Sequence, residues 1–148
     1  MDRENAADLL GKQIAVDAYA DSYRDIIQTL RDPKSILGSD DHANAYRAAS
    51  SLYNRLDAPE RQALEYVIHD SILAGLHRLL VISDGGGSFP ADPALGENRA
   101  SVSLTLSIHD ADDNPISTVQ VTPTEDGEEL HDIFMNYVDE IKSTLRPG

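Results

Sequence analysis

The amino-acid sequence predicts an α+β fold in which three N-terminal helices precede a two-stranded antiparallel hairpin and a C-terminal amphipathic helix. Two observations carry this prediction. Apolar residues recur at helical spacing through residues 5–84 and 122–145, whereas residues 101–121 alternate between apolar and polar side chains. We expect the order ααα-ββ-α within a single domain spanning residues 1–148, with residues 85–100 as a loop between its helical part and the hairpin.

The first predicted helix covers residues 5–30 and has one apolar stripe. The stripe consists of Val16, Ala20, Tyr23, Ile27 and Leu30. Gly11 is a predicted weak point, because glycine disfavours a helix interior. Asp32 precedes Pro33, and a residue before proline is pushed out of the α region, so the helix is expected to end there.

The second predicted helix begins at Ser39, a good N-cap, and presents a narrow face of small residues to a neighbour. That face consists of Ala45, Ala48, Ala49, Leu52 and Leu56.

The third predicted helix has the clearest start and stop. Asp57 and Glu60 form a capping box, and Pro59 lies in the first turn, where its missing N–H costs nothing. Asp84 and three glycines end the helix. Its predicted apolar face comprises Leu64, Val67, Ile68, Ile72, Leu76, Leu79 and Leu80.

The predicted hairpin joins a strand at residues 101–109 to a strand at residues 116–121 through turn residues 110–115. Ile116 is out of phase with Val119 and Val121, which indicates a bulge.

The last helix is expected to start at Thr122, with Pro123 at its first position and Glu125 completing a capping box. Its apolar face comprises Leu130, Ile133, Phe134, Tyr137, Val138, Ile141 and Leu145.

Charge restricts the classes of partner. The chain has 26 acidic and 12 basic side chains, a net charge of −14, and residues 101–148 alone carry −8. Nucleic acid and anionic membrane would be repelled, whereas a basic protein would be attracted. The absence of cysteine excludes disulfides, thiol catalysis and zinc–thiolate sites. With neither a signal peptide nor a membrane span predicted, a cytoplasmic location is expected.

Ionisable residues on the third helix are the main candidate for chemistry. Glu65 and His69 share one side, whereas Asp70 and His77 share another, so a metal site would need ligands from other elements. The pair His69-Asp70 is of the kind used by metal-dependent phosphohydrolases of the HD type, which place it in a larger, all-helical domain. A small metal-dependent hydrolase using His69, Asp70 and His77 is therefore the alternative function.

Residues 52–86, LYNRLDAPERQALEYVIHDSILAGLHRLLVISDGG, resemble the central helix of small uncharacterised bacterial proteins. Some of these resemble immunity proteins paired with secreted toxins. The resemblance implies a small, acidic, non-enzymatic bacterial protein that binds another protein, and it transfers no functional residue.

The leading hypothesis is therefore an acidic protein-binding module without catalytic residues or a cofactor, most concretely an immunity or inhibitor protein that covers a basic toxin surface. The expected contact residues are Asp110, Asp112, Asp113, Glu128, Glu129, Asp132, Asp139 and Glu140. A homodimer, in which two hairpins join into a four-stranded sheet, is compatible with this hypothesis.

Overall fold

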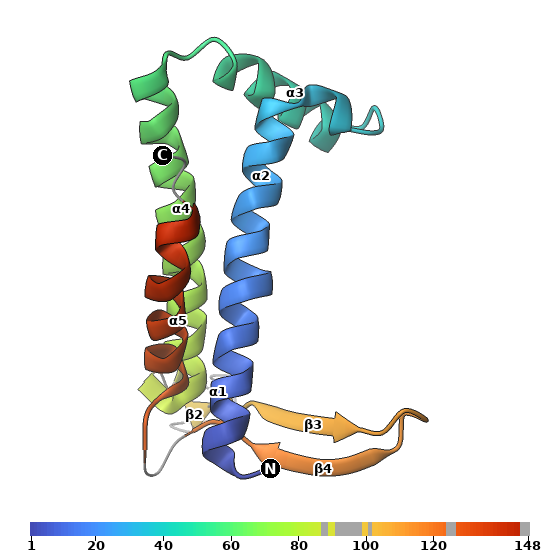
Figure 1. Ribbon diagram of the computed structural model, residues 1–148, viewed down its shortest axis with the longest axis vertical. Helices are drawn as coiled ribbons and strands as arrows, with labels where there is room; N and C mark the ends of the chain where they lie inside the picture. The colour runs from blue at the N-terminus through green and yellow to red at the C-terminus, as the bar shows by residue number, and fades with distance from the viewer. Residues whose placement is uncertain (87–88, 91–98, 101, 124–126, 146–148) are drawn as a thin grey trace.

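The computed structural model describes residues 1–86, 89–90, 99–100, 102–123 and 127–145, and it has an α+β fold. The helices are α1 (Arg3–Gln13), α2 (Ser22–Arg31), α3 (Asp41–Tyr53), α4 (Ala58–Val81) and α5 (Leu130–Leu145). Helices α1 and α2 form one continuous rod, which runs alongside α4 and α5. Helix α3 crosses one end of these helices, and the hairpin of β3 (Thr105–His109) and β4 (Pro115–Gln120) leaves the other end (Figure 1).

The prediction that the first long helix ends before Pro33 is confirmed. A π-helical stretch, Ile14–Asp21, joins α1 to α2 without a break, and Asp32 forms the C-cap. The prediction that Gly11 is a weak point is wrong. Gly11 is buried where α1 meets α5, and a Cβ there would lie only 2.7 Å from Cγ2 of Ile133. The helix keeps glycine at this position because the two helices approach closely.

Asp40, and not Ser39, is the N-cap of α3. The Asp40 carboxylate accepts a hydrogen bond of 2.7 Å from the backbone N–H of Ala43. The carboxylate satisfies one of the amide groups left unpaired at the helix start.

The buried face of α3 also differs from the prediction. Ser50 and Tyr53 are buried, whereas Leu52 is 52% exposed and the predicted alanines Ala45, Ala48 and Ala49 are exposed. The hydroxyl of Ser50 donates a hydrogen bond of 2.8 Å to the carbonyl of Leu30, one of the last carbonyls of α2. This polar contact orients α3, because a buried helix end requires partners for its carbonyl groups.

The predicted start of α4 is confirmed. The Asp57 carboxylate accepts from the N–H of Glu60, and the Glu60 carboxylate accepts from the N–H of Asp57, both at 2.9 Å. A π-helical turn, Ile82–Gly86, follows α4, and Gly85 leaves the helix with a φ of 87°. Of the predicted apolar face, Leu80 is buried, whereas Val67 and Leu79 are more than half exposed.

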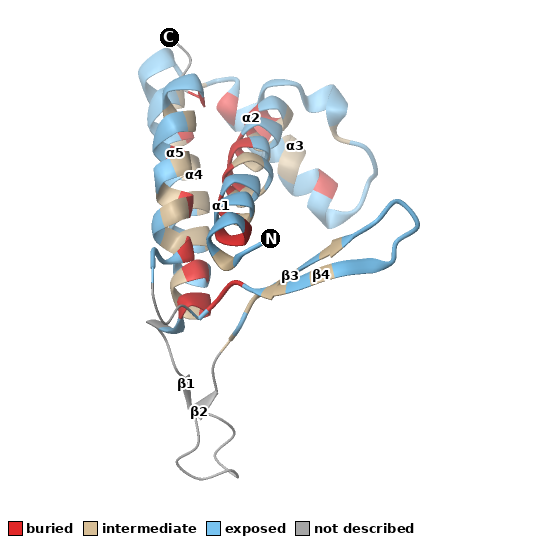
Figure 2. Ribbon diagram, turned by 60° about the horizontal axis from the view of Figure 1, so that its bottom comes forward, coloured by how far each residue is buried: buried red, intermediate tan, exposed pale blue. Residues whose placement is uncertain are grey.

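Buried residues lie mainly on the facing sides of the rod and α5 (Figure 2). The rod contributes mostly small and aromatic side chains, among them Ala6, Ala7, Ala15, Tyr19, Tyr23 and Ile27. The face of α5 is confirmed, since Leu130, Phe134, Val138 and Leu145 are buried.

The predicted start of the last helix is wrong, because α5 begins at Leu130 and not after Thr122. The side chain of Thr122 is fully buried, and its hydroxyl oxygen accepts a hydrogen bond of 3.0 Å from the N–H of Leu104. Thr122 thus extends the pairing of the hairpin strands instead of capping a helix. The predicted capping residue Glu125 lies outside the described residues.

The hairpin pairs β3 (Thr105–His109) with β4 (Pro115–Gln120), one residue earlier in the second strand than predicted. Residues 102–104 are not in a strand, and Ser101 lies outside the described residues. The predicted bulge is confirmed by a register shift between Ile108 and His109, and Ile116 is 66% exposed.

The segment predicted as an irregular loop contains one short pairing. Strands β1 (Phe89–Pro90) and β2 (Arg99–Ala100) are antiparallel, and residues 91–98 lie outside the described part of the chain. No helix among the described residues is long and apolar enough to span a membrane.

Candidate functional site

Asp84 is a buried carboxylate where the last turn after α4 meets the start of α5. Its side chain is only 1% exposed. One carboxylate oxygen, Oδ2, accepts hydrogen bonds from the backbone N–H of His131 at 2.9 Å and from its ring atom Nδ1 at 3.0 Å. Asp84 therefore caps α5 from a position 47 residues earlier in the chain.

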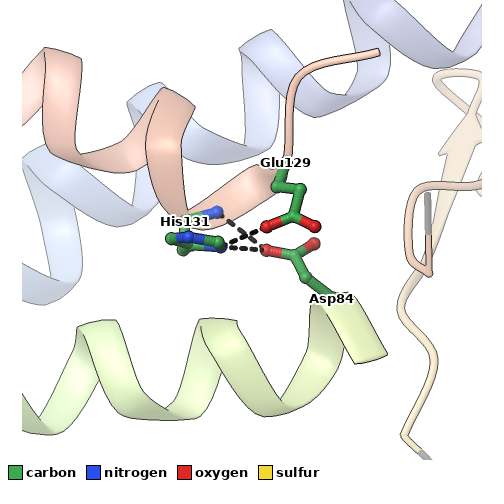
Figure 3. A group of neighbouring side chains, drawn as sticks. All are labelled: Asp84, Glu129 and His131. Carbon is green, nitrogen blue, oxygen red and sulfur yellow. Dashed lines mark hydrogen bonds and ion pairs between the residues drawn. The ribbon is translucent and has the colours of Figure 1, made fainter. Parts of the chain in front are cut away.

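Glu129 also approaches the same histidine (Figure 3). Its Oε2 lies 3.3 Å from Nδ1 of His131, and one ligand atom from each of Asp84, Glu129 and His131 lies within 4.8 Å of the others. We call these three residues the acid–histidine cluster. Both carboxylates lie on the same side of the imidazole and approach the same ring nitrogen, Nδ1 (Figure 3).

Two further side chains surround the acid–histidine cluster. Oδ1 of Asp132 lies 3.5 Å from Nε2 of His131, so a carboxylate also faces the second ring nitrogen. The ring of His77 on α4 meets the ring of His131 edge to face, with centroids 5.3 Å apart. His131 is thus held at both nitrogens, and its position is fixed by α4 as well as by α5.

The metal-site residues predicted on α4 do not meet at one point. His69 contacts the hydroxyl of Tyr19 through Nε2 and packs against the ring of Tyr23. Asp70 is exposed, and His77 lies eight residues beyond His69, about 12 Å along the helix axis. Glu65 is buried and accepts hydrogen bonds from Tyr53 and Arg31. Of the predicted set, only His77 reaches the acid–histidine cluster.

A second feature is an acidic groove of about 450 Å³ between α1 and α5. Four carboxylates line it, those of Glu4, Asp8, Glu128 and Glu140. The cation among the described lining residues is Arg3, whose guanidinium donates to the carbonyls of Val121 at 3.1 Å and of Glu128 at 3.3 Å. Four carboxylates outnumber this one guanidinium, so the described lining of the groove has a net negative charge.

Hydrogen bonds hold the walls of this groove in place. The hydroxyl of Tyr137 donates to Oδ1 of Asp8 at 2.6 Å and thereby joins α5 to α1. The same hydrogen bond, as the largest cause, raises the pKa of Tyr137 above its ordinary value. On the α5 side, the amide of Asn136 donates to Oε1 of Glu128 at 2.9 Å.

The hairpin turn carries a separate group of carboxylates. Asp110 accepts hydrogen bonds of 2.9 Å from the N–H groups of Asp112 and Asn114, and the bond from Asn114 is the main cause that lowers the pKa of Asp110. The side chain of Asp113 is 97% exposed. Asp110 thus shapes the turn, while Asp112 and Asp113 extend into solvent.

The predicted contact residues therefore fall into separate groups. Glu128 and Glu140 line the acidic groove, Glu129 and Asp132 surround His131, and Asp139 is exposed on α5. The aspartates of the hairpin turn lie away from α5 (Figure 1).

Sequence reasoning missed part of each site. Glu4 and Asp8 are four residues apart on the first helix, a spacing that places both on one side of it, but no local pattern indicates that α5 faces them. In the sequence Asp84 is recognisable only as a helix stop, and no local pattern marks His131 as part of a site. Their contact depends on how α4 and α5 pack.

No protein-family model matches the sequence, and no curated protein or solved structure shows a significant match. The fold and its sites therefore define the class, an α+β protein with an acidic groove and a partly buried acid–histidine cluster.

Proposed function

We propose that this protein is a non-enzymatic binding module that recognises a basic protein through the acidic groove between α1 and α5. The observation that carries the proposal is the set of four carboxylates, Glu4, Asp8, Glu128 and Glu140, which outnumber the one arginine in the described lining of the groove. A lysine or arginine side chain of a partner would supply the missing positive charge.

Charge beyond the groove supports the same partner chemistry. The hairpin turn adds Asp112 and Asp113, and the whole chain has a net charge of −14. Complementary charge of this kind accelerates encounter with a basic protein and sets specificity more than it adds affinity. The concrete form that we propose is an immunity or inhibitor protein that covers a basic toxin surface.

The first test uses an arginine-rich peptide as the probe and measures its association by stopped-flow fluorescence at low ionic strength. Because reversal replaces attraction by repulsion, we expect the double variant Glu4→Lys/Glu140→Lys to lower the association rate constant by about tenfold or more. Asp112→Lys tests the hairpin turn, and a smaller decrease is expected there because the aspartate stands away from the groove.

The matched control is Asp25→Lys/Asp70→Lys, which changes the net charge equally at exposed positions outside the groove. Equal losses in the two double variants would mean that the peptide senses only net charge and would refute a groove-specific site. Sedimentation equilibrium of the protein alone gives a second check. A mass twice the 16.1 kDa of one chain would assign the hairpin to self-association.

A further inference from the structure

We propose that Asp84, Glu129 and His131 form a binding site for a divalent transition-metal ion such as Zn²⁺. Imidazole nitrogen and carboxylate oxygen are zinc ligands, and the site offers one of the first and two of the second. The three ligand atoms lie within 4.8 Å of one another. Bonds of about 2 Å to one tetrahedral ion place ligand atoms roughly 3.3 Å apart. Nδ1 of His131 already lies 3.0 Å from Asp84 and 3.3 Å from Glu129, and Glu129, whose side chain is 48% exposed, has room to adjust.

Capping of α5 does not explain the state of the second carboxylate oxygen of Asp84. Oδ2 satisfies the backbone and ring N–H groups of His131, but Oδ1 is buried and has no hydrogen-bond partner among the described residues. A buried carboxylate oxygen without a partner is costly, because desolvation is not compensated. A bound cation between Asp84 and Glu129 compensates both carboxylates.

The surroundings of His131 match those of a histidine that binds a metal. Metal-binding histidines commonly offer one ring nitrogen to the ion and donate the other N–H to a carboxylate, which fixes ring orientation and tautomer. Here Nδ1 faces Asp84 and Glu129 and would bind the ion in place of its proton, while Nε2 would carry the ring proton and faces Oδ1 of Asp132 at 3.5 Å. His77 packs against the ring and helps to hold its orientation.

The start of α5 explains only part of the acid–histidine cluster. The unpaired amides at the start of α5 attract carboxylates, which accounts for Oδ2 of Asp84 and for the presence of Glu129 nearby. The same attraction accounts for Asp132 in the first turn of α5, but it predicts no orphaned Oδ1 on Asp84.

The experiment titrates the full-length, tag-free protein with Zn²⁺ alone in a calorimeter. We expect one ion per chain, and loss of that ion in Glu129→Ala and His131→Ala. We expect Asp132→Asn to bind about 10–100-fold more weakly, the usual effect of losing a carboxylate that orients a ligand histidine. Zinc should also raise the melting temperature of the wild type, because the ion ties the end of α4 to the start of α5.

His109→Ala is the matched control, since His109 also faces a carboxylate, that of Asp113 at 3.3 Å, but on the exposed hairpin. This variant should bind zinc like the wild type. His69→Gln separates the acid–histidine cluster from the alternative hydrolase site, because only the latter needs His69. Glu129 is largely exposed, so its variant stays folded and decides the matter even where His131→Ala unfolds. Wild-type affinity in Glu129→Ala, or a wild-type protein that takes up no zinc, would overturn the proposal.

Discussion

At the scale of single residues, the buried carboxylate of Glu65 is the centre of a hydrogen-bond network between three helices. The side chain accepts hydrogen bonds from the hydroxyl of Tyr53 and from Nη2 of Arg31, the latter at 2.9 Å. Burial, followed by the hydrogen bond to Glu65, raises the pKa of Tyr53. The three side chains come from α4, α3 and α2, so their network fastens these helices together.

Tyr53→Phe should destabilise the fold by about 1–3 kcal/mol near neutral pH, because Glu65 then remains buried without its hydroxyl donor. In the wild type, a tyrosine pKa raised in the folded state stabilises the protein below the unfolded pKa of about 10, and this stability is lost as pH rises through the folded pKa. The variant should therefore lose less stability above pH 10. Urea unfolding followed by circular dichroism at neutral and alkaline pH measures both effects.

Tyr46→Phe is the control for this change. Tyr46 lies on the same helix and packs against His42, and no hydrogen bond of its hydroxyl is found among the described residues. An equal loss of stability in both variants would contradict the role assigned to the Tyr53–Glu65 hydrogen bond.

At the scale of elements, the contact of α1 with α5 requires a glycine. A Cβ at Gly11 would meet Cγ2 of Ile133 at 2.7 Å and the backbone N of Phe134 at 3.4 Å, so the helices would have to separate. The same contact places Glu4 and Asp8 opposite Glu128 and Glu140, and the close approach thereby builds the acidic groove.

Gly11→Ala should cost about 1–3 kcal/mol through overpacking, even though alanine is the better helix former. Gly75→Ala provides the matched control, because nothing lies within 4 Å of a Cβ at this position on α4. We expect that control to gain up to about 1 kcal/mol. Chemical unfolding of both variants measures the difference. Stabilisation by Gly11→Ala would show that α1 and α5 pack less closely than described.

At the scale of the whole molecule, negative charge opposes folding, and in the proposed function it also attracts a basic partner. A net charge of −14 on 148 residues produces repulsion that the folded state concentrates. The repulsion acts over distances comparable with the screening length of about 10 Å in 0.1 M salt. Salt should therefore have the opposite effects on stability and on binding.

Raising NaCl from about 0.01 M to 0.1 M should increase the melting temperature by about 2–4 °C, which corresponds to roughly 1 kcal/mol for a chain of this size. The same salt should slow association with the arginine-rich peptide. A variant with amides at Asp112, Asp113, Asp139 and Glu140 should respond less to salt. Differential scanning calorimetry measures these changes, and a melting temperature that falls with salt would contradict them.

Features determined by the sequence itself depend on neighbours within a few residues. The capping box of Asp57 and Glu60, the stop at Asp32-Pro33, the apolar face of α5 and the bulge near Ile116 are all of this kind. Local backbone chemistry and the periodicity of apolar residues are sufficient to predict them.

Only the tertiary structure decided the features that join distant segments. These features are the hydrogen bond from Ser50 to Leu30 and the start of α5 at Leu130. They also include the contact of Asp84 with His131 and the position of Glu4 and Asp8 opposite Glu128 and Glu140. In each case a buried polar group takes its partner from another element, or two helix surfaces approach through packing. A local sequence pattern does not predict which surfaces will pack together. Both proposed sites could therefore be identified only from the folded chain.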